Sequence, residues 1–278
     1  MNAAPLAAGN PIVTLPLVLA IVLVELASGG AFLVWLLDRR GLAPGGFLKL
    51  TAGVDAVCAA AAVGLIPTII PRDLGTVGLD PGPLGSFGQA LVVFLVLAII
   101  QFALTFVPVK DLRGVAGALT VVVGVATLEI AAIARPTQAP FDLFALLALP
   151  LGALALGGSD AAMLLGHWYL VTPKLSPVPL RSAALVVVAA VVLQIGVVAV
   201  SFARGDLAGA TTEVGLTVAI GIRIGVGLLM TLGVALGGWW TARMNTQSST
   251  GLLYVGLGTA LAGEISARVL FFLTGTPV

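Results

Sequence analysis

Long runs of apolar residues, separated by proline, glycine and charged residues, constrain the fold of this chain more than any other feature. A membrane-spanning helix needs about 20 mainly apolar residues. Stretches of that kind lie at 11–37, 46–70, 89–107, 112–134, 144–171, 180–203, 214–240 and 249–273. Strands of a membrane barrel would alternate apolar and polar residues, and these runs do not. The sequence predicts an all-α polytopic membrane protein, with eight transmembrane helices in a single integral membrane domain over residues 1–278.

The composition excludes several other classes of protein. Only 9% of the residues are charged, against about 25% in a soluble domain, so a soluble globular protein is excluded. Lys and Arg number 13 and Asp and Glu 12, which leaves no basic excess for binding nucleic acid. The single cysteine, Cys58, cannot form an intrachain disulfide, and zinc or iron–sulfur sites need several ligands. No metal site is expected.

The connections between the spans predict the orientation of the chain. Basic residues are concentrated in the odd-numbered connections, which contain Arg39, Arg40, Lys49, Lys110, Arg113, Lys174, Arg181 and Arg243. Cytoplasmic loops carry such an excess, so both termini are predicted on the outer, periplasmic side. The four tryptophans fall at the same predicted cytoplasmic ends. The longest connection, 71–88, is rich in Pro and Gly and is expected to be a loop.

Seven charged residues remain inside the predicted spans, with one histidine near a span end. An ionised group at the bilayer centre costs about 3 kcal/mol or more, so such groups usually face the bundle interior, pair and mark a function. Structural ion pairs are the alternative. The residues are Glu25, Asp55, Glu129, Asp160, Glu264, Arg223, Arg268 and His167.

Depth sorts these residues into groups. Glu264 and Arg268 are four residues apart in the outer half of the last span, where a salt bridge can form. Arg223 and Glu129 also fall toward the outer ends of their spans, so an outer polar cluster is predicted. Such a cluster could bind a polar, anionic or carbonyl-bearing ligand and exchange protons.

The other buried acids lie deeper and suggest a route for protons. Glu25, Asp160 and Asp55 are expected near the midplane or somewhat inward. His167 follows Asp160 by seven residues, on the same helix face, near the cytoplasmic boundary. A ladder from the outer cluster through Asp160 or Glu25 to His167 is therefore a hypothesis. Proton exchange is assigned to Glu264, Asp160, Glu25 and Glu129, and cofactor binding to Arg223, Arg268, His167 and Tyr169.

The segment Gly166-His167-Trp168-Tyr169 offers little for haem, because bis-histidine ligation needs a second histidine and the chain has one. We expect no haem or iron–sulfur cluster in this chain. His167 is either an interfacial hydrogen-bonding or proton-exchanging group or a packed residue of the aromatic belt. The glycine-rich stretches match no phosphate loop or dinucleotide fingerprint and are interpreted as packing glycines.

The first and last spans carry short motifs that resemble a known family. These are Glu25-Leu26-Ala27-Ser28-Gly29-Gly30-Ala31-Phe32, Ser249-Thr250-Gly251-Leu252-Leu253-Tyr254 and Gly263-Glu264-Ile265-Ser266-Ala267-Arg268-Val269-Leu270-Phe271-Phe272. With the eight-helix plan, they are similar to the membrane-anchor subunits of dimethyl sulfoxide reductase and the polysulfide reductase integral membrane subunits. Glu264 and Arg268 match the last-helix motif, whereas the other candidates rest on depth and chemistry.

The resemblance implies a subunit of the bacterial cytoplasmic (inner) membrane that binds menaquinone or ubiquinone near the outer face. It would exchange electrons with a docked iron–sulfur or cytochrome subunit, and would act in catalysis only within that complex. Two other functions stay open. The same acids could couple proton movement to solute transport, or the charges could be satisfied pairs in a structural assembly subunit.

Overall fold

The computed structural model describes residues 11–69, 78–136, 141–172, 175–207 and 213–278. Within these residues, eight helices are long and apolar enough to cross a membrane. Their bounds are α1 (Pro11–Arg39), α2 (Gly45–Ile69), α3 (Pro81–Leu104), α4 (Lys110–Ile133), α5 (Leu143–Val171), α6 (Val178–Arg204), a seventh span made of α7 (Val214–Gly221), η3 (Ile222–Met230) and α8 (Thr231–Thr241), and α9 (Thr246–Thr274).

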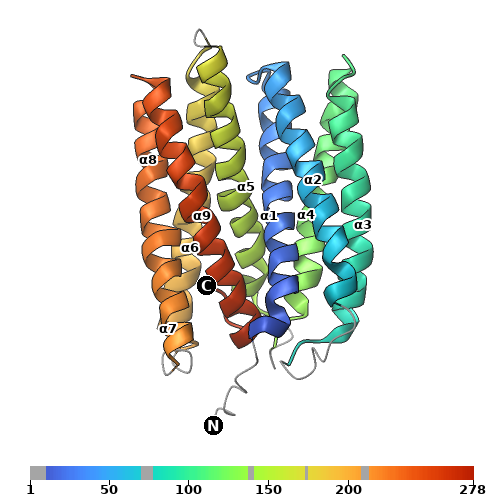
Figure 1. The fold of residues 1–278 in the computed structure, drawn as a ribbon, viewed down its shortest axis with the longest axis vertical. Helices are drawn as coiled ribbons and strands as arrows, with labels where there is room; N and C mark the ends of the chain where they lie inside the picture. The colour runs from blue at the N-terminus through green and yellow to red at the C-terminus, as the bar shows by residue number, and fades with distance from the viewer. Residues whose placement is uncertain (1–10, 70–77, 137–140, 173–174, 208–212) are drawn as a thin grey trace.

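The spans run up and down side by side (Figure 1). We call the end where α1 begins at Pro11 and α9 ends at Thr274 the lower end, as in Figure 1. The upper end is where α1 ends at Arg39 and α9 begins at Thr246. Large apolar side chains such as Val57, Val122 and Leu193 are exposed on the outside of the bundle, as expected for helices that face lipid.

The helices form two groups of four spans. In the first group α1, α2, α3 and α4 pack in a closed ring, and in the second α5, α6, α8 and α9 do the same. Figure 1 shows the two groups next to each other, with α1 and α5 at the boundary. The groups meet chiefly through α1 and α5, with further contacts of α1 with α9 and of α4 with α5.

Paired glycines set the close crossing of α1 and α5. A Cβ atom on Gly29 would lie 1.8 Å from the carbonyl oxygen of Ala153 and 2.9 Å from Cα of Gly157. A Cβ atom on Gly157 would lie 2.4 Å from the carbonyl oxygen of Leu26. Small residues allow this approach in a membrane, where helix association depends on packing. The two groups are therefore in backbone contact.

Two local features differ from the sequence prediction. The third span begins at Pro81 and not at 89, so residues 81–88 are helical and the predicted loop is wrong for them. Asp80 caps this helix by accepting a hydrogen bond from the Gly82 amide at 2.9 Å, and proline is well tolerated at the first helical position. Residues 71–77 of that predicted loop lie outside the described residues. The seventh span contains a π-helical segment, η3, that periodicity did not indicate.

Candidate functional site

Four charged side chains meet where the two helix groups join. On α9, Arg268 Nη2 lies 2.6 Å from Glu264 Oε2. Arg268 Nε lies 2.9 Å from Oε1 of Glu25 on α1, and Arg223 Nη1, on η3, lies 2.7 Å from Glu264 Oε1. Each of the four residues is at most 1% exposed. We call Glu25, Arg223, Glu264 and Arg268 the central charge network; its two acids and two bases balance.

Further elements hold the network in place. Gln194 on α6 donates from Nε2 to Glu264 Oε1 at 2.8 Å. Arg268 Nη2 also donates to the carbonyl oxygen of Ala148 on α5 at 3.2 Å. Side chains or backbone from α1, α5, α6, η3 and α9 thus converge on one point. Buried ion pairs are tolerated when additional hydrogen bonds satisfy their remaining groups, and this arrangement supplies several.

Gly152 on α5 provides the space that the network occupies. A Cβ atom there would lie 2.6 Å from Arg268 Nη2, 2.6 Å from Glu25 Oε1 and 2.7 Å from Glu264 Oε2. These distances are far below ordinary contact, so no other residue fits without displacing the charged groups. The network and this glycine therefore form one packed unit.

The π-helical segment brings Arg223 to the network. A Cβ atom on Gly227 of η3 would lie 2.4 Å from Cα of Gly263 on α9, so the two backbones touch. Glu264 is the residue after Gly263 on α9, and Arg223 lies about one turn before Gly227 on η3. Single π turns inside α-helices often occur at functional sites.

Several buried polar atoms of the network and of Gln194 have no hydrogen-bond partner among the described residues. They include Arg223 Nε, Gln194 Oε1, Glu25 Oε2 and Arg268 Nη1. An unpaired polar atom in an apolar interior costs free energy. The network thus retains donors and acceptors that a polar ligand atom could satisfy.

An apolar recess adjoins the network on the outside of the bundle. It lies between α6 and η3 and has a volume of about 240 Å³. Ile195, next to Gln194, and Ile224, next to Arg223, both contribute to it. The complete lining is Ile195, Val198, Ala199, Phe202, Ile224, Leu228 and Leu229. A hydrophobic ring from the lipid could therefore come close to two polar residues of the site.

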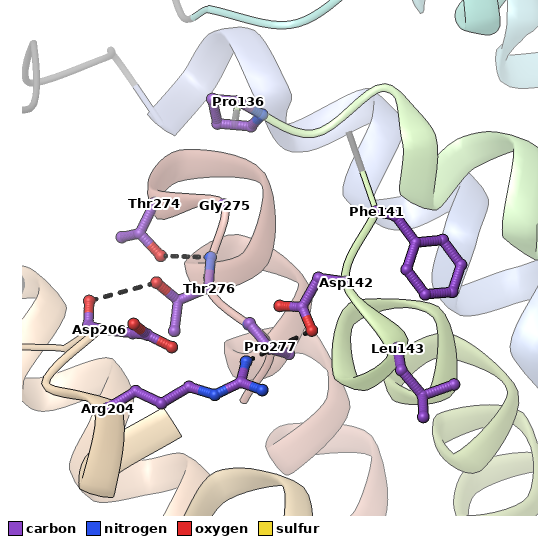
Figure 2. Close-up of a pocket in the computed structure, with 10 residues that line it drawn as sticks. All are labelled: Pro136, Phe141, Asp142, Leu143, Arg204, Asp206, Thr274, Gly275, Thr276 and Pro277. Carbon is purple, nitrogen blue, oxygen red and sulfur yellow. Dashed lines mark hydrogen bonds and ion pairs between the residues drawn. The ribbon is translucent and has the colours of Figure 1, made fainter. Parts of the chain in front are cut away.

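A polar pocket of about 540 Å³ occupies the lower end of the second group (Figure 2). Asp142, before α5, accepts hydrogen bonds from the Phe144 amide at 3.0 Å and from Arg204 Nη1 at 3.4 Å. Thr276 donates to the carbonyl oxygen of Asp206 at 3.3 Å. Thr274, which lines the pocket, is six residues after Arg268 on α9, and this spacing corresponds to about 9 Å along a helix. The network thus lies a short way inward from a polar opening.

A second pair of buried acids lies apart from the network. Asp55 on α2 and Asp160 on α5 are both buried and interact electrostatically with each other. A Cβ atom on Gly30 would lie 2.0 Å from Asp55 Oδ1, so this glycine makes room for the carboxylate against α1. Neither acid has an ion-pair partner among the described residues. The pair spans the boundary between the two helix groups.

The structure brings together some of the predicted residues and separates others. Arg223, Glu264 and Arg268 lie together as predicted, and Glu25, which was predicted deeper in the membrane, joins them. Glu129 does not join: it is on α4 in the first group, half-buried, and its electrostatic partner is Arg135. Burial lowers the pKa of the Arg135 guanidinium. Residue depth alone could not show that Glu129 and Glu264 belong to different groups.

The upper part of the proposed proton ladder is not continuous. His167 is exposed, whereas Asp160 is buried, and His167 Nδ1 lies 2.9 Å from the hydroxyl of Tyr254. The hydroxyl of buried Tyr169 donates to the carbonyl oxygen of Ser176. Tyr169 thus has a local structural partner, and its assignment to cofactor binding stays a prediction.

Gly152 and Gln194 are the site residues that sequence reasoning did not assign. Gln194 was recognisable as a polar group inside an apolar span. Gly152 carried no signal, because it is one of 35 glycines, and its importance follows only from the position of α5 against Arg268. Comparison of the chain with family models, curated proteins and solved structures finds no match. Function must therefore be argued from the site itself.

Proposed function

We propose that the chain is the quinone-binding subunit of a membrane electron-transfer complex, as its resemblance to the dimethyl sulfoxide reductase anchors implies. It would lie in the bacterial cytoplasmic membrane with both termini on the outer side, and menaquinone or ubiquinone would be exchangeable. A docked iron–sulfur or cytochrome subunit would exchange electrons with the quinone. The observation that carries the proposal is the buried Arg223, which has an unpartnered Nε and whose chain neighbour Ile224 lines an apolar recess on the outside of the bundle.

The chemistry of a quinone suits this combination. The ring is apolar and lipid-soluble, its carbonyl oxygens accept hydrogen bonds, and its interconversion with quinol takes up or releases two protons and two electrons. Arg223 would donate from Nε to a carbonyl oxygen. Glu264 and Glu25 would accept or return protons as general bases or acids. The polar pocket at the lower end is close enough to exchange those protons with water.

Quinone content of the purified protein tests the proposal. Arg223→Gln is expected to lower the amount of co-purifying quinone at least about tenfold, because a charged donor contributes about 1.5–3 kcal/mol. Arg113→Gln is the matched control, since Arg113 forms an ion pair at 2.9 Å with Asp38 at the upper end. Equal quinone content in the two variants, or a wild-type chain that retains no quinone and binds none when it is added, would contradict the proposal.

A proton-coupled transporter is the second candidate, and the Asp55 and Asp160 pair favours it. Two buried acids without a basic partner across the boundary of two four-span groups could carry a coupling proton. Proteoliposomes containing a pH-sensitive dye would be screened with candidate solutes. A solute-dependent pH change that Asp160→Asn abolishes would support transport, and its absence across amino acid, sugar and carboxylate solutes would count against it.

A further inference from the structure

Two arginines and two tryptophans form a row at the upper end of the second helix group. The Arg181 guanidinium carbon lies 5.0 Å from the ring centre of Trp239. The Trp239 and Trp240 ring centres are 6.3 Å apart, and the Arg243 guanidinium carbon lies 3.5 Å from the Trp240 ring centre. We call these four residues the Arg–Trp row. Both cations are thus placed over aromatic faces, which favour them.

Neither arginine of this row forms an ion pair with an acidic side chain in the described part of the chain. No acidic residue occurs at 161–205 or at 214–263, and these segments include α6, the end of α5 and the start of α9. At the upper end of the first group, by contrast, Asp38 and Asp111 pair with Arg113 and Arg39. The Arg–Trp row is therefore free to pair with an anion from outside the chain.

A recess of about 340 Å³ begins at Arg243 and extends along the start of α9. Its lining combines the polar residues Asn245, Thr246 and Gln247, which follow Arg243, with apolar ones. Asn245 caps α9 by accepting hydrogen bonds from the Gln247 and Ser248 amides at 2.9 and 3.2 Å. The recess thus has the size and polarity for a compact headgroup.

Apolar side chains continue outward from the same place. Trp240 is 51% exposed, and Leu236, one turn earlier on α8, is also exposed. Met244 next to Arg243 is exposed as well. A ligand that fits has an anionic head at the arginines and a hydrocarbon chain along α8. A free anion would leave this apolar surface uncovered.

We propose that the Arg–Trp row and its recess bind the phosphate of an anionic phospholipid. Basic pockets between membrane helices bind anionic headgroups in this way. The site is independent of the quinone proposal, since it lies at the opposite end of the bundle from the polar pocket and shares no residue with the central charge network. The upper end is also the one predicted to be cytoplasmic.

Quenching of tryptophan fluorescence tests the site directly. The purified chain in neutral detergent is titrated with phosphatidylglycerol or phosphatidylcholine brominated on the acyl chains. Phosphatidylglycerol should quench at about 25-fold lower concentration, because each of the two arginines adds about 1 kcal/mol of attraction, or roughly fivefold. Arg181→Gln combined with Arg243→Gln should abolish the difference, whereas Arg204→Gln should preserve it. Arg204 is the matched control, because it stacks on Phe144 at 4.6 Å at the lower end.

Three results would overturn the proposal. The first is equal quenching by the two lipids, and the second is a difference in quenching that persists in the double variant. The third is competition by inorganic phosphate that is as strong as competition by the lipid, which would indicate a site for a soluble anion. Should the double variant not fold, Arg243→Gln alone is used, because this side chain is exposed. Its expected loss is about fivefold in the preference for phosphatidylglycerol.

Discussion

Replacing Gly152 by alanine should disrupt the central charge network directly, because the added methyl group would meet three of its charged atoms. The added Cβ would lie 2.6 to 2.7 Å from three charged atoms, against ordinary contacts of 3.4 to 4 Å. Each atom must therefore withdraw by about 0.7 to 0.8 Å. The three atoms belong to Glu25, Glu264 and Arg268, and both acids pair with Arg268, so the three side chains cannot all retreat while keeping their ion pairs.

The expected cost follows from these contacts. Overpacking a well-packed interior costs about 1–3 kcal/mol, and breaking a buried ion pair costs about 3–5 kcal/mol. Because one ion pair of the network needs to lengthen but not to break completely, we expect Gly152→Ala to lower the free energy of unfolding by about 3 kcal/mol. Quinone content should fall together with stability, since Arg223 is held through Glu264.

Unfolding of the purified protein in detergent, followed by circular dichroism, measures this loss. Gly158→Ala is the matched control on the same helix, because its Cβ would meet only the tips of Val187, at 3.3 Å, and Val186, at 4.0 Å. It should cost less than about 1 kcal/mol. If the two variants unfold at the same temperature, the network is not packed against Gly152.

Three further predictions concern other parts of the structure. Gly29→Ala should prevent native packing of the two helix groups, because its Cβ would meet the backbone of Ala153, which cannot move aside; a native gel-filtration profile and normal thermal midpoint would refute this. Asn245→Ala should cost about 1 kcal/mol by removing the cap of α9, and an unchanged unfolding free energy would count against that cap. His167→Phe should lose its hydrogen bond to Tyr254 yet destabilise by less than about 1 kcal/mol, since the pair is exposed; a loss of bound quinone in this variant would instead place His167 in the site.

The sequence predicted those parts of the structure that depend on one helix at a time. The spans follow from apolar length, and the Glu264 and Arg268 pair follows from a spacing of four residues. The start of α3 was missed because Pro81, Gly82 and Gly85 resemble a loop, although a capped helix end accommodates them.

Features that depend on two or more helices could not be predicted. Glu25 pairs with Arg268 because α1 lies against α9, and helix order in a bundle leaves no trace in the spacing of residues. The same limit applies to Glu129, which has a suitable depth but belongs to the other helix group. The π turn that positions Arg223 also arises from packing, through the contact of Gly227 with Gly263.

The shared ion pair between Arg268 and Glu25 has a consequence for how the protein is made. Considered alone, the first helix group would hold Glu25 without its base, and the second would hold Arg268 without this acid. The α1 span enters the membrane before α9 is synthesised. Until Arg268 is in place, Glu25 therefore has to be protonated or in contact with water. The last span therefore completes the ion pair of the first, and a chain truncated before Arg268 would leave Glu25 without its base.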